Sequence, residues 1–321
     1  MRSQDTLRAA YAHARDVAAG HGRTYYLATR MLPPERRSAI HALYAFARMV
    51  DDVIDVDAGH QLSYAHCAEQ LDLLEHYLRQ LTAGVELPDT HEIDEETRHV
   101  LSALTDTIHR FDIAPAPFWD FFASMRMDLP GTPTYRSSYR TMAELEEYMR
   151  GSAAGIGLQM VPVLGTIVDP HEAEPYAAAL GEAFQVTNFL RDVGEDLDRG
   201  RVYLPSEDLE AFGVDTELLL HSQKTGKPDR RIVQALAHFI AINRGQYRYA
   251  VKGIPMLNPV ARPAIFAAYR LYSSILDYIE EGGYPVLNTR VIVPNRRRFA
   301  IALPLAGKAI AKRAVGAGRS I

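Results

Sequence analysis

The chain has 321 residues, a formal net charge of −5 and one cysteine, Cys67. Hydrophobic residues make up 47% and charged residues 23%, which is ordinary for a globular protein with a substantial core. The negative charge argues against a nucleic-acid-binding protein, which usually presents a strongly basic face. A lone cysteine excludes an internal disulfide, and no apolar run is long enough to span a bilayer. With no apolar signal core near the first residue, we expect a soluble, cytoplasmic protein.

Apolar residues recur at three- and four-residue spacing along most of the chain, which indicates helices. The segments with this pattern are 35–56, 61–82, 94–110, 142–165, 173–197, 229–251 and 259–281. Short breaks rich in Pro and Gly separate them, and strand-like alternation is missing. Neither a Gly-x-Gly-x-x-Gly loop nor a Walker loop is present. We therefore expect an all-α bundle with one domain over residues 1–321, of which the last ~20 residues form a flexible basic tail.

The predicted helix 35–56 carries a polar stripe. Tyr44, Arg48, Asp51 and Asp55 follow helical spacing and share one face, with apolar residues along both sides. A charged stripe bordered by apolar residues on both sides is not typical of a solvated surface. We interpret it as the lining of a cleft inside the bundle.

The predicted helix 173–197 repeats this arrangement with Gln185, Asn188, Asp192 and Asp196 on one face. Buried carboxylates cost several kcal/mol each unless they are paired or bound to metal. Two such stripes facing one another would surround a shared space with hard oxygen ligands, which suit Mg²⁺. The alternative is a structural network of ion pairs with the arginines of the two stripes. A matched pair of stripes makes that alternative the weaker one.

Two further segments allow more than one interpretation. Arg199-Gly200-Arg201 follows the second stripe, where the two arginines could grip a diphosphate or simply favour the end of a helix. In segment 142–165, Tyr148 precedes a run of small residues, Gly151 to Gly157, which either makes room for a ligand or allows close helix packing. Aromatic residues near the proposed cleft could stabilise a carbocation, although core packing is the more usual role for each of them. These are Tyr25, Tyr26, Tyr44, Phe184, Phe189, Tyr269 and Tyr272.

Several motifs together resemble the squalene/phytoene synthase family. They are His21-Gly-Arg-Thr-Tyr25-Tyr26, Leu32-Pro-Pro-Glu-Arg-Arg37, the stripe from Tyr44 to Asp55, the run from Asn188 to Pro205, Tyr272-Ser-Ser-Ile-Leu-Asp277, and Arg290-Val-Ile-Val293. The resemblance covers about residues 10 to 300. It implies an isoprenoid-synthase helical bundle around a central cavity. It also implies a prenyltransferase that joins two prenyl diphosphates head to head through a cyclopropyl diphosphate.

The resemblance also assigns roles to individual residues. It implies two or three Mg²⁺ ions, with Mn²⁺ as a substitute, held by Asp51, Asp55, Asn188, Asp192 and Asp196. The residues implied to act in catalysis are Tyr44, Arg48, Asp51, Asp55, Tyr148, Asp192, Asp196 and Tyr272. Those implied to bind substrate are His21, Tyr25, Thr29, Arg48, Gln185, Asn188, Arg191, Arg201 and Arg290, with the three arginines at 48, 191 and 290 neutralising diphosphate.

Within the family, the run after Asp192 is most similar to phytoene synthases, which use two geranylgeranyl diphosphates. The enzymatic alternatives are synthases of dehydrosqualene, squalene or presqualene diphosphate, which use farnesyl diphosphate. A chain-elongating synthase fits less well, because its aspartate motifs are spaced differently. We find no recognisable NADPH site, which squalene formation would need. The small Thr29 is expected to leave room for a longer prenyl tail, since farnesyl-using relatives carry an aromatic residue there.

Two further expectations concern partners. The basic, partly apolar end of the chain, from Arg296 to Arg313, could rest on the inner face of an anionic membrane or remain a solvated tail. A non-enzymatic family member acting as an assembly or binding factor should lack some metal carboxylates, and all four are present here. The sequence leaves the oligomeric state open.

Overall fold

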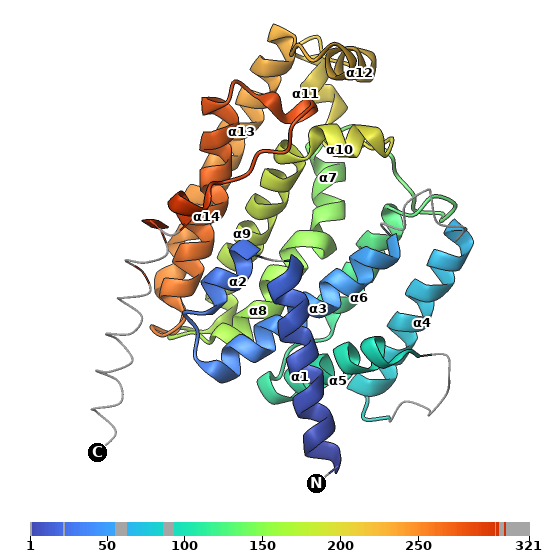
Figure 1. Ribbon diagram of the computed structural model, residues 1–321, viewed down its shortest axis with the longest axis vertical. Helices are drawn as coiled ribbons and strands as arrows, with labels where there is room; N and C mark the ends of the chain where they lie inside the picture. The colour runs from blue at the N-terminus through green and yellow to red at the C-terminus, as the bar shows by residue number, and fades with distance from the viewer. Residues whose placement is uncertain are drawn as a thin grey trace.

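The computed structural model describes residues 2–21, 23–54, 63–85, 93–298, 300, 301 and 305. Their regular structure is helical, as Figure 1 shows. Within these residues, extended pairing is limited to two isolated bridges, Ser138 with Val202 and Thr166 with Leu257. The expectation of an all-α protein is therefore confirmed.

The helices follow the predicted segments closely, and their bounds, including the 3-10 and π segments labelled η, are as follows. In chain order they are α1 (Arg2–His21), α2 (Arg23–Thr29), α3 (Pro34–Ile54), α4 (Tyr64–Thr82), α5 (Glu95–Phe111), α6 (Ala116–Met127), α7 (Met142–Met149), η1 (Arg150–Gly155), α8 (Ile156–Leu164), α9 (Pro170–Arg191), α10 (Val193–Asp198), α11 (Ser206–Glu210), α12 (Thr216–Thr225), α13 (Arg230–Ala250), η2 (Val251–Met256), α14 (Arg262–Glu281) and η3 (Pro285–Leu287). The helical pattern did not identify α1, α2, α6, α11 or α12. α2 is a short helix, and α6 is apolar around most of its circumference, so neither shows a clear amphipathic period.

Side-chain caps set the starts of several helices. The Asp94 carboxylate accepts the N–H of Thr97 at 2.7 Å, and the Thr141 hydroxyl accepts the N–H of Glu144 at 3.2 Å. Asp215 caps α12 in the same way. Each cap satisfies one of the N–H groups that the first helical turn leaves unpaired. These local contacts help to fix where α5, α7 and α12 begin.

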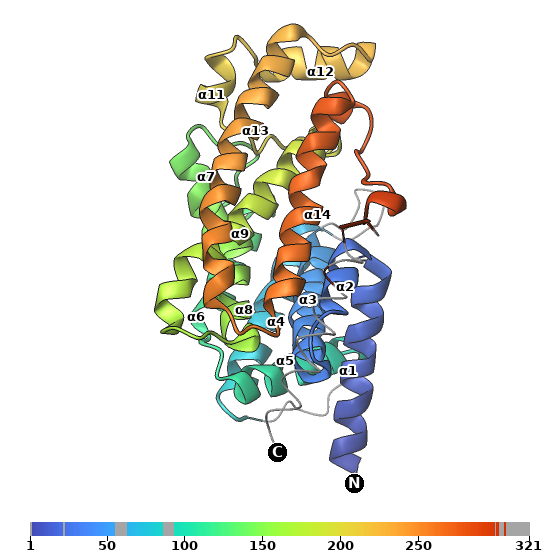
Figure 2. The same ribbon diagram turned by 90° about the vertical axis from the view of Figure 1, so that its left-hand side faces the viewer.

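Long helices from the second half of the chain form one side of the bundle. In Figures 1 and 2, α9, α13 and α14 run alongside one another, and α8 leads into the lower end of α9. The first half of the chain packs against them through α2 and α3. Between α3 and α6 the core is aromatic, with Phe46 in contact with Phe118, Phe121 and Phe122. α3 and α9, which carry the two predicted polar stripes, therefore belong to one bundle.

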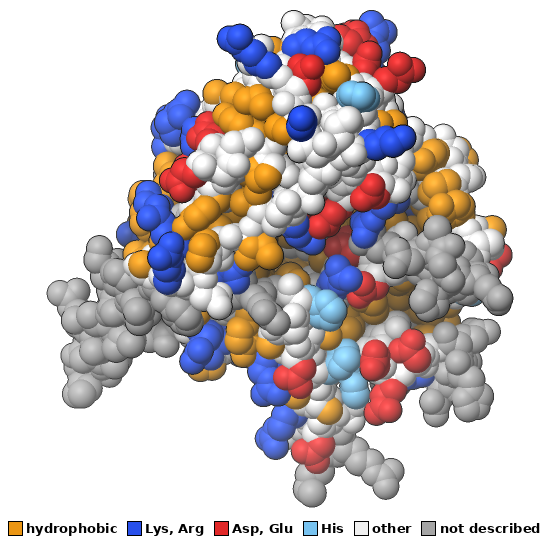
Figure 3. Space-filling model, turned by 45° about the horizontal axis from the view of Figure 1, so that its top comes forward, with side chains coloured by type: hydrophobic (Ala, Val, Ile, Leu, Met, Phe, Trp, Pro, Cys, Tyr) orange, Lys and Arg blue, Asp and Glu red, His pale blue; other side chains and the backbone are white. Residues whose placement is uncertain are grey.

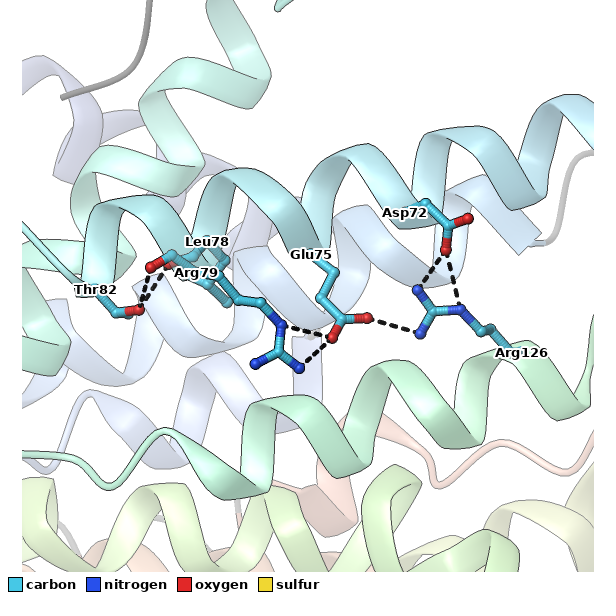
Figure 4. A network of polar contacts seen from close by, with 6 residues as sticks. All are labelled: Asp72, Glu75, Leu78, Arg79, Thr82 and Arg126. Atoms are coloured by element: carbon cyan, nitrogen blue, oxygen red, sulfur yellow. Dashed lines mark hydrogen bonds and ion pairs between the residues drawn. The ribbon is translucent and has the colours of Figure 1, made fainter. Parts of the chain in front are cut away.

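A polar network joins helix α4 and helix α6 on the outside of the bundle (Figure 4). Arg126, near the end of α6, contacts Asp72 at 2.6 Å and Glu75 at 2.8 Å on α4. Arg79 donates to the same Glu75 at 2.9 Å and lies 3.9 Å from the ring centre of Trp119 on α6. The network therefore holds the end of α6, which leads directly into the cavity described below.

Two predicted single helices are interrupted in the structure. Segment 142–165 consists of α7, a π-helical turn η1 and α8. A Cβ at Gly151 would lie 1.9 Å from the backbone oxygen of Asp120, and one at Gly157 would lie 2.2 Å from that of Ala177. The small residues here therefore permit close helix packing, which was one of the two interpretations.

The predicted helix 173–197 ends as α9 at Arg191 and resumes as α10 at Val193. Asp192 lies at the junction with φ −104° and ψ 14°. α10 packs closely on the segment before residue 290, where a Cβ at Gly194 would lie 2.2 Å from the Leu287 oxygen. The interruption therefore leaves Asp192 at the junction, while Asp196 lies on α10.

Candidate active site

A cavity of about 1060 Å³ lies between α3, α8, α9 and α14. On the face seen in Figure 3, acidic and basic side chains lie together near the centre of the molecule, beside hydrophobic ones. Fourteen of the predicted site residues line the cavity: His21, Tyr25, Tyr44, Arg48, Asp51, Tyr148, Gln185, Asn188, Arg191, Asp192, Asp196, Arg201, Tyr272 and Arg290. Asp55 lies outside the described residues.

Thr29 does not lie among the residues that line the cavity. Its buried hydroxyl donates to the Tyr26 carbonyl at 2.8 Å and lies 2.9 Å from His41 Nε2. Thr29 therefore lies behind the cavity wall, and its expected effect on the accepted prenyl length stays a prediction. Tyr25, one turn earlier on α2, lines the cavity instead. The reason is that the hydroxyl of Thr29 finds its partners behind this wall, on α2 and α3.

On α3, Asp51 and Arg48 line the cavity. Arg48 forms an ion pair with Asp52 one turn later. Its Nε is buried and has no hydrogen-bond partner among the described residues. A buried guanidinium N–H without a partner is unusual, because it loses its hydration without compensation. Arg48 therefore has an N–H group without a partner close to the cavity wall.

At the end of α9, Asp192 is held by two arginines. Arg191 donates to both of its carboxylate oxygens, at 2.7 and 2.5 Å, and Arg290 approaches it at 3.3 Å. Arg290 also pairs with Glu195 at 3.1 Å. The side chains of Arg191 and Asp192 are each 16% exposed, so this pairing is largely shielded from water. Arg290 follows η3, so the end of the chain contributes charge to the cavity rim.

Two observations suit a cation at the second stripe. Burial, followed by the nearby charge of Asp192, raises the pKa of the Asp196 carboxyl to about 7. The Asn188 amide donates to Gln185 at 3.4 Å, while its buried Oδ1 has no partner among the described residues. An unsatisfied amide oxygen and a destabilised carboxylate, both from residues that line the same cavity, are donors that a hard divalent cation would satisfy.

In the part of the chain that the structure describes, no three or more Asp, Glu, His or Cys residues lie close enough together to hold a metal ion by themselves. Asp51 lies on α3, whereas Asp192 and Asp196 lie across the same cavity on the other wall. This distribution fits magnesium, which keeps water ligands and takes oxygens from phosphate groups instead of an all-protein cage. The donor chemistry therefore fits the predicted metal.

Asp128 is a cavity residue that the sequence reasoning missed. It is buried in the loop after α6 and accepts hydrogen bonds from the hydroxyls of Tyr148, at 2.6 Å, and Tyr203, at 2.7 Å. Arg201 donates to its backbone oxygen at 2.7 Å. Arg201, which was expected to grip diphosphate, is thus tied to this loop. The only sequence signal for Asp128 was a carboxylate between Met127 and Leu129, which is weak.

Aromatic rings line much of the remaining wall. Tyr25 stacks on Tyr44 at 5.2 Å, and Phe184 stacks on Tyr272 at 4.4 Å. Burial raises the pKa of the Tyr272 hydroxyl and raises that of Tyr44 to about 12, so both stay neutral at ordinary pH. Of the other aromatic candidates, Phe189 also lines the cavity, whereas Tyr26 and Tyr269 do not. Neutral π faces in a sheltered cavity can stabilise a cation.

The lining changes character along α9. Near its C-terminal end the cavity residues are polar, namely Gln185, Asn188 and Asp192. Toward its N-terminal end they are apolar, namely Phe184, Gly181, Leu180, Ala177, Tyr176 and Ala173. The cavity therefore has a charged end and an apolar end. This division suits an amphipathic molecule with an anionic head and a long hydrocarbon tail.

Comparison with known proteins agrees with this geometry. Residues 18–297 match the squalene/phytoene synthase family. This chain belongs to that family. It is 37% identical over 311 residues to the 15-cis-phytoene synthase of Synechocystis sp., an alignment that covers 94% of this chain and 85% of the relative. It is 36% identical over 318 residues to the phytoene synthase of Arthrospira platensis, with 95% of each chain covered.

The fold is also similar to solved members of the family. A crystal structure of a dehydrosqualene synthase in complex with ligand superposes with a TM-score of 0.80 at 27% identity, covering 95% of this chain and 98% of the other. The isoprenoid-synthase bundle expected from the motifs is therefore confirmed. Family members of this kind act on prenyl diphosphates and generally need a divalent metal.

Proposed function

We propose that this chain is a phytoene synthase, a prenyltransferase that joins two geranylgeranyl diphosphates head to head. In the first half-reaction, a cyclopropyl diphosphate forms with loss of one diphosphate and one proton. In the second half-reaction, the cyclopropane opens and rearranges with loss of the second diphosphate and a second proton. Two C20 chains thereby give one C40 hydrocarbon, and no reductant is consumed.

The observation that carries this proposal is the single cavity with a carboxylate- and arginine-rich end and an apolar end. A prenyl diphosphate has the same division between head and tail. The sequence relatives that match over most of the chain include phytoene synthases at 33–37% identity. These names favour geranylgeranyl diphosphate over the farnesyl diphosphate of the dehydrosqualene, squalene and presqualene alternatives.

We further propose that Asp51, Asp55, Asn188, Asp192 and Asp196 hold two or three Mg²⁺ ions, for which Mn²⁺ can substitute. When bound, the metal supplies positive charge that lets diphosphate leave. Arg48, Arg191 and Arg290 contribute hydrogen bonds and charge to the departing group. Gln185 accepts a hydrogen bond from the Asn188 amide and so helps to fix the orientation of that side chain.

The uncharged lining protects the cation that remains. Tyr44 and Tyr272 present neutral rings, each stacked on another cavity residue that fixes its orientation. Tyr148 is fully buried and oriented by Asp128. Because the tail end is apolar, water has no polar partner there and cannot readily quench the cation. His21, Tyr25 and Arg201 line the same space and complete the proposed substrate contacts.

Within the described part of the chain, no helix combines the length and apolar character needed to cross a membrane. We propose that residues 1–321 act as one catalytic domain in the cytoplasm, to which a membrane presents its lipid-like substrate. Most of the basic tail after Arg298 lies outside the described residues, and its contact with an anionic membrane stays a prediction. A pure protein that binds only neutral vesicles, or none, would contradict that contact.

The activity is tested by incubating the pure protein with geranylgeranyl or farnesyl diphosphate and Mg²⁺, with and without NADPH. We expect a C40 hydrocarbon from the C20 substrate, with no dependence on NADPH. A C30 product formed faster from farnesyl diphosphate would support the dehydrosqualene or squalene alternative. If neither substrate released diphosphate, the assembly-factor alternative would gain support. A second measurement is then needed: the affinity for prenyl diphosphate should be the same in the wild type and in Asp192→Asn if Asp192 has no role in substrate binding.

A further inference from the structure

The apolar end of the cavity is closed by elements far from the aspartates. Tyr176 near the start of α9, Gly253 and Ile254 in η2, and Leu257 after it line this end. Tyr176 precedes Asn188 by twelve residues on the same helix. At about 1.5 Å per residue, the two lie about 18 Å apart along the axis. Tyr176 is therefore placed where the far end of a tail would stop.

The wall at Tyr176 is thin. Its half-buried ring lines the cavity and stacks at 4.8 Å on Tyr249, which is 43% exposed. Only this aromatic pair therefore separates the cavity from the outer surface along that line. Ala173 and Ala177 flank Tyr176 on the cavity face of α9, and neither carries a side chain long enough to close the space alone.

The position of the Tyr176 side chain is tightly constrained. A Cβ built on Gly253 would lie only 2.3 Å from the Tyr176 Cβ, so the backbone of η2 presses directly against this residue. Tyr249 packs against the other part of the ring. A side chain held between backbone and a stacked partner cannot easily move aside, because tightly packed contacts resist displacement. Tyr176 therefore forms a fixed stop instead of an adaptable one.

We propose that Tyr176 is the residue that sets the maximum prenyl-chain length this cavity accepts. The inference rests on the proposed function, since it assumes that the tail occupies the apolar end. The tail of a substrate one isoprene unit longer would meet the Tyr176 ring. Shortening the side chain opens the cavity toward Tyr249 and relieves that overlap.

The test compares two substrates in the full-length protein with Mg²⁺: the prenyl diphosphate that the wild type uses best and the one that is one isoprene unit longer. Steady-state kcat/KM is measured for both in the wild type, Tyr176→Ala and Tyr176→Leu. We expect the ratio of longer to shorter substrate to rise about tenfold or more in Tyr176→Ala. The rise in Tyr176→Leu should be smaller, because leucine fills part of the space. Tyr176→Leu also guards against poor folding of the alanine variant.

Tyr249→Ala is the matched control. It removes the stacking partner that holds the Tyr176 ring, but the residue does not line the cavity, so the substrate ratio should rise less than in Tyr176→Ala. An unchanged ratio in both Tyr176 variants would overturn the inference, as would an equal rise in Tyr249→Ala. Failure of the proposed function would give a different result from failure of this inference, because the wild type would then make no C40 hydrocarbon. The ratio remains measurable with whichever diphosphate the wild type converts.

Discussion

The hydroxyl of Tyr148 donates a 2.6 Å hydrogen bond to Asp128, a buried carboxylate that also accepts the hydroxyl of Tyr203 at 2.7 Å. Burial, followed by the charge of Asp128, holds the pKa of the Tyr148 hydroxyl well above its usual range. Tyr148 thus remains a neutral ring with a fixed direction at the cavity wall. Asp128 is a positioning residue, since it acts on the cavity through the two tyrosines.

Asp128→Asn should lower kcat and leave the KM for the prenyl diphosphate nearly unchanged. The substitution removes the charge from both hydrogen bonds and replaces one acceptor with an amide NH2, where hydrogen bonds to charged groups are worth about 1.5–3 kcal/mol each. Because only part of that loss reaches the transition state, we expect kcat to fall about 10- to 100-fold. Steady-state kinetics at saturating Mg²⁺ measure both parameters.

The matched control is Tyr139→Phe. Tyr139 packs against Tyr148 and Tyr203, but its buried hydroxyl has no hydrogen-bond partner among the described residues. Its removal should leave kcat within a factor of about two. If Asp128 acts through Tyr148, then Tyr148→Phe and Asp128→Asn should be non-additive in the double variant. Full additivity would show that Asp128 acts independently of this hydrogen bond.

Arg290→Gln should strengthen binding of Mn²⁺ to the substrate-free protein and weaken binding of the prenyl diphosphate. In the structure Asp192 is shared by Arg191 and Arg290, so a cation must compete with both guanidinium groups. Arg290 is 49% exposed, and a partly exposed pair contributes about 0.2–1 kcal/mol. We therefore expect about a two- to fivefold gain in Mn²⁺ affinity, measured by titration calorimetry without substrate.

Arg296→Gln provides the control for net charge, because Arg296 is exposed and does not line the cavity. It should change neither affinity. An equal gain in both variants would indicate a general charge effect. A loss of Mn²⁺ affinity in Arg290→Gln would mean that the arginine supports the metal site instead of competing with it.

The buried His41 should make the free energy of unfolding fall in acid. Burial, followed by the charges of Arg37 and Arg15, lowers the pKa of its imidazole from 6.5 to about 4. The ring stacks on Tyr26 and hydrogen-bonds with Thr29, so the folded state holds it neutral. The unfolded chain binds a proton near pH 6.5 and the folded chain does not. The stabilisation is therefore complete above pH 6.5 and is lost as the pH falls toward 4.

The full loss from this group amounts to about 3 kcal/mol, from a pKa difference of about 2.5 units. Urea unfolding between pH 7 and 4.5 measures it. His41→Gln should flatten the pH dependence over this range, whatever its effect on stability at pH 7. His221→Gln, at an exposed position, should retain the wild-type slope. A wild-type slope in His41→Gln would exclude His41 as the source.

The sequence anticipated what depends on helical periodicity. Arg48 and Asp51 lie on one face of α3, and Asn188 lies on the polar face of α9. Both follow from the rule that residues three and four apart lie together on a helix. Polar residues with apolar neighbours on both sides indicated a cavity instead of solvent, and these side chains do line one. The metal and substrate roles assigned to them stay predictions.

The same periodicity could not identify what depends on tertiary contacts. Asp128 is a single carboxylate in a loop, and its partners lie 20 and 75 residues further along the chain. The interruption of the second stripe at Asp192 lacks a proline or glycine at the break itself. Thr29 was placed by resemblance alone, and the hydrogen bond that turns it toward His41 involves a residue twelve positions away. None of these relationships has a local sequence signal.

Glu75→Gln should destabilise the fold more than Asp72→Asn does. Glu75 is 16% exposed and bridges Arg79 and Arg126, whereas Asp72 is 69% exposed and contacts Arg126 alone (Figure 4). Loss of a shielded carboxylate between two arginines leaves both guanidinium groups with weakened pairing, which should cost about 1–2 kcal/mol. Loss of the exposed partner should cost at most about 0.5 kcal/mol. Urea unfolding at low salt measures both costs, and equal costs would show that the network acts as an ordinary surface ion pair.

Because Arg126 lies two residues before Asp128, Glu75→Gln should also lower kcat, while Asp72→Asn should not.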